Sequence, residues 1–281
     1  MAGEHGLCCN ELQRLAGLPD EDIDLATGAL AIAADAYPDI DFCESLAILD
    51  ALADQARPRL ERVTGPTERV RALATYLHEE VGFRGNLDAY YDPRNSYLND
   101  VLSRGLGIPI TLAIIHIEVA KRVGLELKGV NFPGHFLLRF DGGPDGPLFL
   151  DPFNPTSFLC AGDCAKLLAE MSDGKVKFDE EFLEPATARQ VLVRMLKNLK
   201  LVHFQSGELT RAVTAIDRIL MLAPDQSLEY RDRGVAWLKL EDYRAAKGDL
   251  VRYLELVPGA PDRAAVEATV RYLEIRLEPL N

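Results

Sequence analysis

Apolar positions divide the first part of the chain into helical segments. Residues 23–36 are almost continuously apolar, and residues 42–56 resume at helical spacing after Pro38. We expect these two segments to form a pair of antiparallel helices. A third helix should begin at residues 64–67 (Thr-Gly-Pro-Thr), which offer a cap residue and an early proline, and should end before Gly82.

The middle of the chain combines one strongly apolar helix with short strands. Pro109 precedes the apolar segment 110–123, and Gly124 follows it, which predicts a buried helix. Three β-prone runs follow at residues 127–132, 136–140 and 148–150. Turn signals separate them, so we predict a small antiparallel sheet packed on this helix. Between residue 155 and Thr187 the chain is less regular.

From Thr187 onwards the pattern is helical and repeats. Pro224 and Pro258 lie 34 residues apart, and aligning them pairs Ala212 with Ala246. This period is the tetratricopeptide spacing. Small alanines allow two helices to cross closely, and proline cannot continue a helix.

The two predicted repeat units differ in quality. Gly234 suits the second unit, whereas Lys200 occupies the equivalent position of the first, so we expect one unit to be degenerate. The sequence therefore predicts two domains. Residues 1–186 hold a helix-rich N-terminal region and an α+β core, and residues 187–281 hold tetratricopeptide-like helical repeats.

Composition and charge exclude several classes of protein. Hydrophobic residues make up 48% of the 281 residues and charged residues 27%, which is ordinary for a globular protein. The net charge of −13 argues against sequence-independent binding to nucleic acid and against binding to anionic membranes. From Arg189 to the end the chain has 15 basic and 13 acidic residues, so the acidity belongs to the front part. The longest apolar stretch is shorter than the roughly 20 residues of a membrane span.

The cysteines and the N-terminus indicate a reducing compartment. The five cysteines form an odd set without C-x-x-C spacing: Cys8, Cys9, Cys43, Cys160 and Cys164. The first residues lack the basic and apolar regions of a signal peptide. We therefore expect reduced thiols in a cytoplasm. No Cys or His cluster has the spacing of a structural zinc site, and we expect neither a metal nor a cofactor.

One histidine and one aspartate could carry chemistry. His135 and Asp151 lie 16 residues apart, at the ends of neighbouring predicted strands. Antiparallel neighbours could bring the two side chains into contact, and a carboxylate on one nitrogen orients a histidine to act as a base with the other. A purely structural hydrogen bond at the strand ends is the alternative.

Four motifs in order resemble the SirB-type proteins. They are residues 95–102 (Asn-Ser-Tyr-Leu-Asn-Asp-Val-Leu), 107–113 (Gly-Ile-Pro-Ile-Thr-Leu-Ala), 129–136 (Gly-Val-Asn-Phe-Pro-Gly-His-Phe) and 150–154 (Leu-Asp-Pro-Phe-Asn). This family joins a transglutaminase-like core to C-terminal tetratricopeptide repeats, and the resemblance implies a papain-like α+β core. His135 matches the catalytic His of the active enzymes, and Asp151 matches their Asp. The Cys of their Gly-x-Cys-x-x-x-Ala pattern is replaced by Pro109, which implies a pseudoenzyme.

Other readings of the same residues remain open. Thr111 carries a hydroxyl in the first turn of the apolar helix, although a cap or packed residue is the common use of Thr there. A cysteine-dependent amidase, peptidase or transglutaminase could combine His135 and Asp151 with a relocated nucleophile at Cys160 or Cys164. In a third possibility the repeats carry the function and the transglutaminase-like core serves only as a scaffold.

The resemblance and the helix start suggest a binding cleft. Backbone N–H groups at a helix start favour an anion or a carbonyl oxygen, and His135 could donate a further hydrogen bond. The candidate ligand-binding residues are Asn95, Asn99, Thr111 and Asn131. These residues could instead brace their loops. We therefore expect a bacterial, cytoplasmic protein that binds a protein or peptide partner.

Overall fold

The computed structural model describes residues 5–277, without the side chains of residues 5–10 and 156. The chain folds as two compact units, Met1–Met195 and Leu196–Asn281. The division falls inside helix α8 (Ala188–Gln205), and the boundary predicted at residue 187 lies just before this helix. Cys8 and Cys9 lie outside the side chains that the structure describes.

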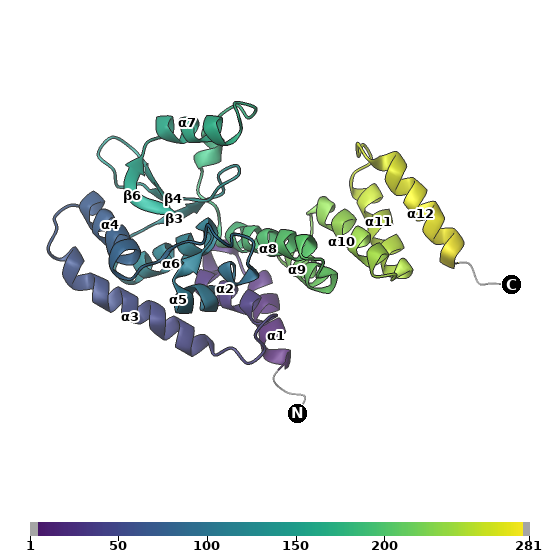
Figure 1. The fold of residues 1–281 in the computed structure, drawn as a ribbon, viewed down its shortest axis with the longest axis horizontal. Coiled ribbons are helices and arrows are strands. Elements are labelled where there is room, and N and C mark those ends of the chain that lie inside the picture. The colour runs from purple at the N-terminus through teal and green to yellow at the C-terminus, as the bar shows by residue number, and fades with distance from the viewer. Residues whose placement is uncertain (1–4, 278–281) are drawn as a thin grey trace. The chain divides into compact units, whose positions relative to one another are not determined.

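The first unit surrounds one buried helix with others (Figure 1). Its α-helices are α1 (His5–Ala16), α2 (Leu25–Ala33), α3 (Phe42–Leu60), α4 (Pro66–Thr75), α5 (Leu98–Arg104), α6 (Pro109–Arg122) and α7 (Ala161–Met171). Helices α2, α3, α4 and α5 all pack against α6. Shorter helical turns are η1 (Asp20–Asp22), η2 (Tyr76–Glu80), η3 (Pro93–Asn95) and η4 (Glu180–Leu183). The helix pair, the start of α4 after Gly65 and the buried helix predicted from the sequence are all present.

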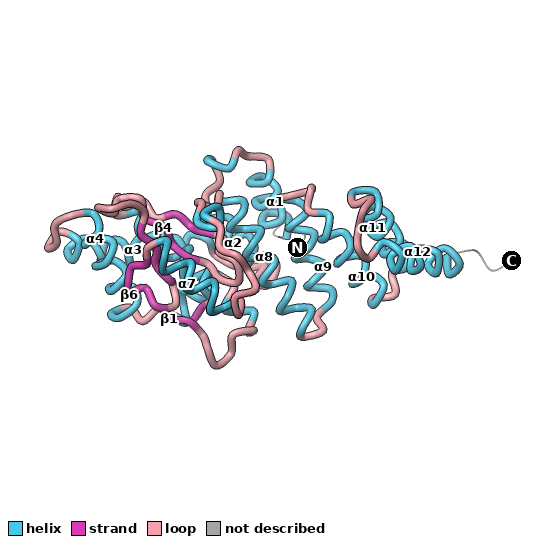
Figure 2. The backbone as a smooth tube through the Cα atoms, turned by 90° about the horizontal axis from the view of Figure 1, so that it is seen from above, coloured by secondary structure: helices cyan, strands magenta, loops and turns pink. Residues whose placement is uncertain are grey.

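The predicted small antiparallel sheet is confirmed and has four strands (Figure 2). They are β3 (Lys128–Val130), β4 (Leu137–Phe140), β5 (Leu148–Asp151) and β6 (Asn154–Leu159), and they pair in that order. Helix α6 packs against β3 and β4, and α7 packs against β5 and β6. Two further strands, β1 (Arg84–Gly85) and β2 (Leu106–Gly107), pair in parallel.

Strand β6 and helix α7 lie where the sequence suggested irregular chain. Proline disfavours a strand because it lacks an N–H, but β6 lies at the edge of the sheet. At an edge the missing N–H can face solvent, so no hydrogen bond between strands is lost. Cys164 and Leu168, one turn apart on α7, are both buried in the cluster that covers the sheet. The other buried members of this cluster are Val130, Phe132, Leu137, Phe149 and Leu183. Helices therefore pack against both faces of the sheet.

The second unit is helical, as the repeat predicts. Besides the end of α8 it contains α9 (Leu209–Leu222), α10 (Ser227–Lys239), α11 (Tyr243–Leu256) and α12 (Arg263–Leu277). At Gly234 an added Cβ would come within 2.9 Å of the Leu250 side chain, so a glycine lets α10 and α11 approach closely. Lys200 takes the equivalent position in the degenerate unit, and its Nζ bonds the Glu229 carboxylate at 2.7 Å. An ion pair thus replaces close packing in that unit.

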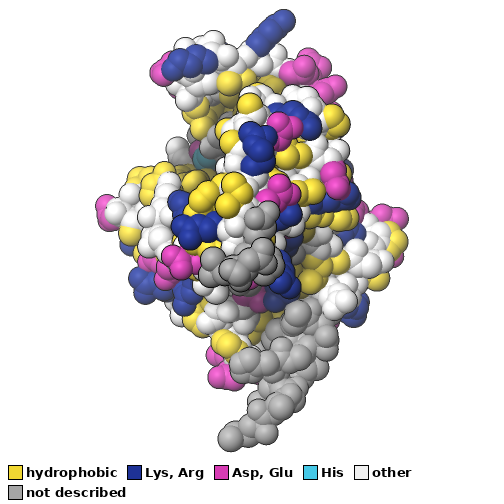
Figure 3. Space-filling view, turned by 90° about the vertical axis from the view of Figure 1, so that its right-hand side faces the viewer, with side chains coloured by type: hydrophobic (Ala, Val, Ile, Leu, Met, Phe, Trp, Pro, Cys, Tyr) yellow, Lys and Arg dark blue, Asp and Glu magenta, His cyan; other side chains and the backbone are white. Residues whose placement is uncertain are grey.

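One face of the molecule mixes charges of both signs. Figure 3 shows Lys and Arg side chains interspersed with Asp and Glu, and hydrophobic side chains between them. In the part of the chain that the structure describes, no helix is both long and apolar enough to cross a membrane.

Candidate functional site

The structure brings His135 and Asp151 together. The imidazole Nε2 and the Asp151 Oδ1 are 2.8 Å apart. The His135 side chain is 13% exposed and that of Asp151 is 25% exposed, so the pair is sheltered but reachable from solvent. The two strands predicted to meet are neighbours in the sheet, as this contact requires.

The pairing of β4 with β5 brings the two segments together. Leu138 lies opposite Leu150, the residue before Asp151. His135 lies in the turn that precedes β4, two residues before Leu137. Its loop turns back through Gly134, whose φ of 75° favours glycine. The His135 backbone N–H donates to the Phe132 carbonyl at 3.1 Å and holds the loop closed.

A tight turn orients the carboxylate. Strands β5 and β6 are joined directly after Asp151, and the Phe153 backbone N–H donates to the same Asp151 Oδ1 at 2.8 Å. The Phe153 ring stands edge-on to the imidazole, with ring centroids 6.1 Å apart. A Cβ on Gly85 would come within 2.6 Å of this ring, so glycine makes room for it. The sequence reasoning did not single out Phe153 or Gly85.

The imidazole keeps one nitrogen for other partners. Its Nε2 faces Asp151, and its Nδ1 has no hydrogen-bond partner among the residues that the structure describes. A histidine held in this way can accept or donate a proton at Nδ1, according to its tautomer. The pair can therefore bind a polar group or, beside a nucleophile, act as a base.

The position expected for a nucleophile holds a buried proline. Pro109 is the first residue of α6 and lies in the core. The Thr111 hydroxyl is fully buried, donates to the Asn95 carbonyl at 2.7 Å and accepts from the Ile108 N–H at 3.1 Å. These bonds give Thr111 the capping role that the sequence left as an alternative, and its part in ligand binding stays a prediction.

The two candidate cysteines differ in environment. Cys164 is fully buried, and desolvation raises the pKa of its thiol to about 12. Cys160 is exposed at the start of α7, and its Sγ donates to the Asp163 Oδ2 at 3.1 Å. Within the described residues neither sulfur forms a hydrogen bond with His135.

The three candidate asparagines separate into two kinds. Asn95 is fully buried and satisfied, since its amide donates to the Ala89 carbonyl at 2.7 Å and accepts from the Asn86 amide at 3.0 Å. Asn99 and Asn131 instead have buried Oδ1 atoms without a partner in the described structure. Buried polar atoms normally find a partner, so Asn99 and Asn131 are the better candidates for ligand contacts.

Two cavities contain predicted site residues. One, of about 260 Å³, lies between β5, β6 and α7 and is lined by Asp151, Asp163 and Glu170 together with Lys166. Another, of about 620 Å³, includes Asn99.

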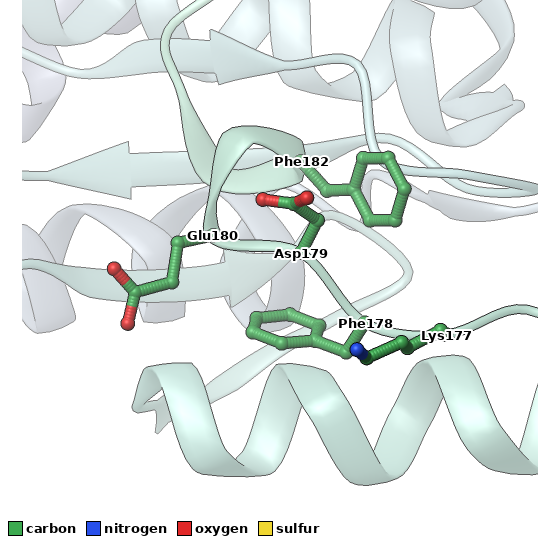
Figure 4. Close-up of a pocket in the computed structure, with 5 residues that line it drawn as sticks. All are labelled: Lys177, Phe178, Asp179, Glu180 and Phe182. Atoms are coloured by element: carbon green, nitrogen blue, oxygen red, sulfur yellow. The ribbon is translucent and has the colours of Figure 1, made fainter.

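A third cavity, of about 560 Å³, is lined by residues 177–180 and by Phe182 (Figure 4). Phe178 and Phe182 line it with Asp179 between them, and it contains no predicted site residue. The described cavities thus place Asp151 and Asn99, but not Asn95 or Thr111, at accessible surfaces.

Family models match both parts of the chain. Residues 44–197 match the transglutaminase-like superfamily, and residues 199–271 match the tetratricopeptide repeat. The predicted order of a transglutaminase-like core followed by repeats is therefore confirmed.

Similar proteins extend over most of the chain. A UPF0162 protein of Xylella fastidiosa (strain 9a5c) is 42% identical over 247 residues, which cover 87% of this chain and 88% of that protein. A UPF0162 protein of Pseudomonas aeruginosa is 32% identical and covers 85% of this chain and 87% of its own length. F-box only protein 21 of Mus musculus is 30% identical over 167 residues, 55% of this chain and 25% of that protein. No solved structure matches the chain. The chain thus belongs to the transglutaminase-like superfamily and, within it, to the UPF0162 family.

Proposed function

We propose that this protein is a transglutaminase-like pseudoenzyme that binds a protein or peptide partner. The observation that carries the proposal is the oriented His135–Asp151 pair combined with Pro109 at the position matched to the nucleophile. A proline side chain has no atom that can attack an acyl group, so no thioester can form there. The pair then has a binding role.

The environments of the cysteines weigh against a relocated nucleophile. The thiolate is the reactive form of cysteine, and the raised pKa of Cys164 keeps its thiol protonated at neutral pH. Cys160 donates its S–H to the Asp163 carboxylate.

The site has the groups needed to hold a peptide amide or carboxylate. His135 offers Nδ1, and Asp151 fixes the orientation of the ring. Asn131, four residues before His135, adds an unpaired carbonyl oxygen.

The repeats support binding to a protein. Tetratricopeptide units stack helices and present extended surfaces on which other chains bind. The second unit has large apolar side chains at its surface, namely Leu228, Val235, Leu240, Leu256, Tyr272 and Ile275. Exposed apolar side chains of this kind are suited to contact with a partner.

An acyl-transfer assay tests the non-catalytic half of the proposal. The intact protein is incubated with benzyloxycarbonyl-glutaminylglycine and hydroxylamine, and the hydroxamate formed with release of ammonia is measured. We expect no more hydroxamate than with His135→Ala, and no change after iodoacetamide treatment. Hydroxamate that requires His135 and disappears on alkylation would refute the proposal and favour a relocated cysteine.

A peptide array tests the binding half. The wild-type protein and His135→Ala are applied to the same array of peptides at equal concentration. We expect some peptides to retain only the wild type, because the imidazole contributes a hydrogen bond to the ligand. Identical retention of both proteins by every peptide would show that the pair takes no part in binding.

A further inference from the structure

The cavity of about 620 Å³ that includes Asn99 lies within the first unit, away from the cavity beside Asp151. It is lined by the segment that joins α2 to α3, by the first two turns of α3 and by α5. The two cavities share no lining residue. A volume of this size is typical of a site for a small molecule or a long side chain.

Two buried polar groups of this cavity lack a hydrogen-bond partner. The Asn99 Oδ1 on α5 is buried without a partner in the described structure. Ser45 on α3 is 6% exposed, and its hydroxyl forms no hydrogen bond with the residues that the structure describes. A buried polar group without a partner costs free energy. Two such groups from different helices on one cavity indicate that a ligand supplies the partner.

The charged groups of the cavity are all acidic. Asp39, Asp41 and Glu44 line it together with neutral residues, and none of the three carboxylates forms an ion pair with a described residue. Asp41 and Glu44 also serve the start of α3, since the Asp41 Oδ1 accepts from the Cys43 N–H at 2.8 Å and Glu44 lies in the first turn. Asp39 has no such use. The missing partner is therefore expected to be a cation.

The wall that carries Asp39 is fixed to α5. The Tyr37 hydroxyl donates to the Asp100 Oδ2 at 2.6 Å, and the Tyr37 ring stands edge-on to Tyr97 with centroids 5.6 Å apart. The Ile40 N–H donates to the Tyr37 carbonyl at 3.0 Å and closes the turn before Asp39 leads into α3. These contacts hold the cavity open before a ligand binds.

The chemistry of the walls favours an organic cation over a metal ion. Within the described residues, no group of three or more His, Cys, Asp and Glu side chains could hold a metal ion. Pro38, Ile40 and Ile48 add an apolar surface to the acidic one. An alkyl chain that ends in a charged group can cover such a surface and keep its charge at the polar edge.

We propose that this cavity binds an alkylammonium group whose N–H groups donate to Ser45, Asn99 and Asp39. An ammonium group has three donors and no acceptor, so it can satisfy all three oxygens at once. The apolar residues contact the alkyl chain. The ammonium group belongs either to a free amine or to a lysine side chain of a partner. The site does not depend on the proposed function, because it shares no residue with the His135–Asp151 pair.

A titration of the full-length, ¹⁵N-labelled protein tests the site through the backbone amide resonances of residues 39–45. The ligands are putrescine, Nα-acetyl-lysine methylamide, Nα-acetyl-norleucine methylamide, which lacks the ammonium group, and magnesium chloride. We expect saturable shifts with at least one of the two amines and none with the norleucine compound. The amine that binds more tightly identifies the source of the ammonium group.

Variants assign the binding to the named oxygens. Ser45→Ala and Asn99→Ala should each weaken amine binding at least about tenfold, because a hydrogen bond to a charged group is lost. Asp39→Asn should weaken it about twofold to fivefold, since this carboxylate is exposed. The matched control Asp54→Asn removes an exposed carboxylate of α3 that does not line the cavity, and it should bind as the wild type does.

Stability separates ligand binding from a structural role of the serine. Ser45→Ala removes a hydroxyl without a partner from a helix, so the thermal midpoint of the free protein should stay the same or rise. A lower midpoint would assign the hydroxyl to the fold and overturn the proposal. Binding of the norleucine compound as tightly as the amines, no saturation, tighter binding of magnesium, or equal effects of Asp39→Asn and Asp54→Asn would also overturn it. The hydroxamate assay has no bearing on this site, so the two proposals fail separately.

Discussion

His116, in the middle of α6, should make the protein sensitive to mild acid. It is 2% exposed, its Nδ1 bonds the Leu112 carbonyl at 2.8 Å, and its buried Nε2 has no partner in the described structure. Desolvation lowers the pKa of His116 from 6.5 to about 4, with a smaller contribution from His78, and the bond to Leu112 opposes the shift. Protonation of this ring therefore favours the unfolded chain.

The size of the effect follows from the two pKa values. Between pH 6.5 and about 4 the unfolded chain binds the proton and the folded chain does not, so stability falls as the pH falls through this window. Full protonation of the unfolded ring corresponds to about 3 kcal/mol of lost stability, and the step from pH 8 to pH 5 to about 2 kcal/mol. Above pH 6.5 the ring is neutral in both states and the penalty disappears.

Urea unfolding at pH 8 and pH 5 measures this effect. The apolar variant His116→Leu removes the titrating ring, so it should lose about 2 kcal/mol less stability than the wild type between the two pH values. Ile114→Leu changes packing in the same buried helix without touching a titrating group, and its difference from the wild type should not depend on pH. Equal pH dependence in the wild type and His116→Leu would refute this account.

Two further variants test the geometry around the imidazole. Gly85→Ala should displace the Phe153 ring and lower the free energy of unfolding by about 1–3 kcal/mol. The control Gly248→Ala has open space at its Cβ on a helix, so it should be neutral or stabilising by up to about 1 kcal/mol. Equal effects of the two substitutions on thermal unfolding would contradict the close contact. Pro109→Cys should create a thiol that iodoacetamide alkylates more slowly than the exposed Cys43 and Cys160, because position 109 is buried. A thiol at position 109 that reacts as fast as the exposed cysteines would contradict the burial of this position.

Elements with strong local signals were predictable from the sequence. The buried helix has an apolar run, a proline in its first turn and a glycine after its end, and each of these acts within a few residues. The 34-residue period could be found without knowledge of packing, because Ala212 and Ala246 recur at the same place in the two units. Strand β6 was missed because a proline excludes a central strand, and the sequence alone does not show which strand lies at the edge.

The site was predictable only in part. The nearness of His135 and Asp151 follows from the pairing of β4 with β5, which the sequence suggests by its turn positions. The distinction between Asn95, whose amide is satisfied, and Asn131, whose carbonyl oxygen is not, depends on neighbours distant in sequence.

The contacts that orient the His135–Asp151 pair do not depend on a catalytic nucleophile. Sheet register, the left-handed Gly134 and the Phe153 N–H each position the pair, and each belongs to the backbone of the β4–β5–β6 meander. The fold would keep the pair oriented even after the loss of a nucleophile, so the pair by itself is weak evidence for acyl transfer.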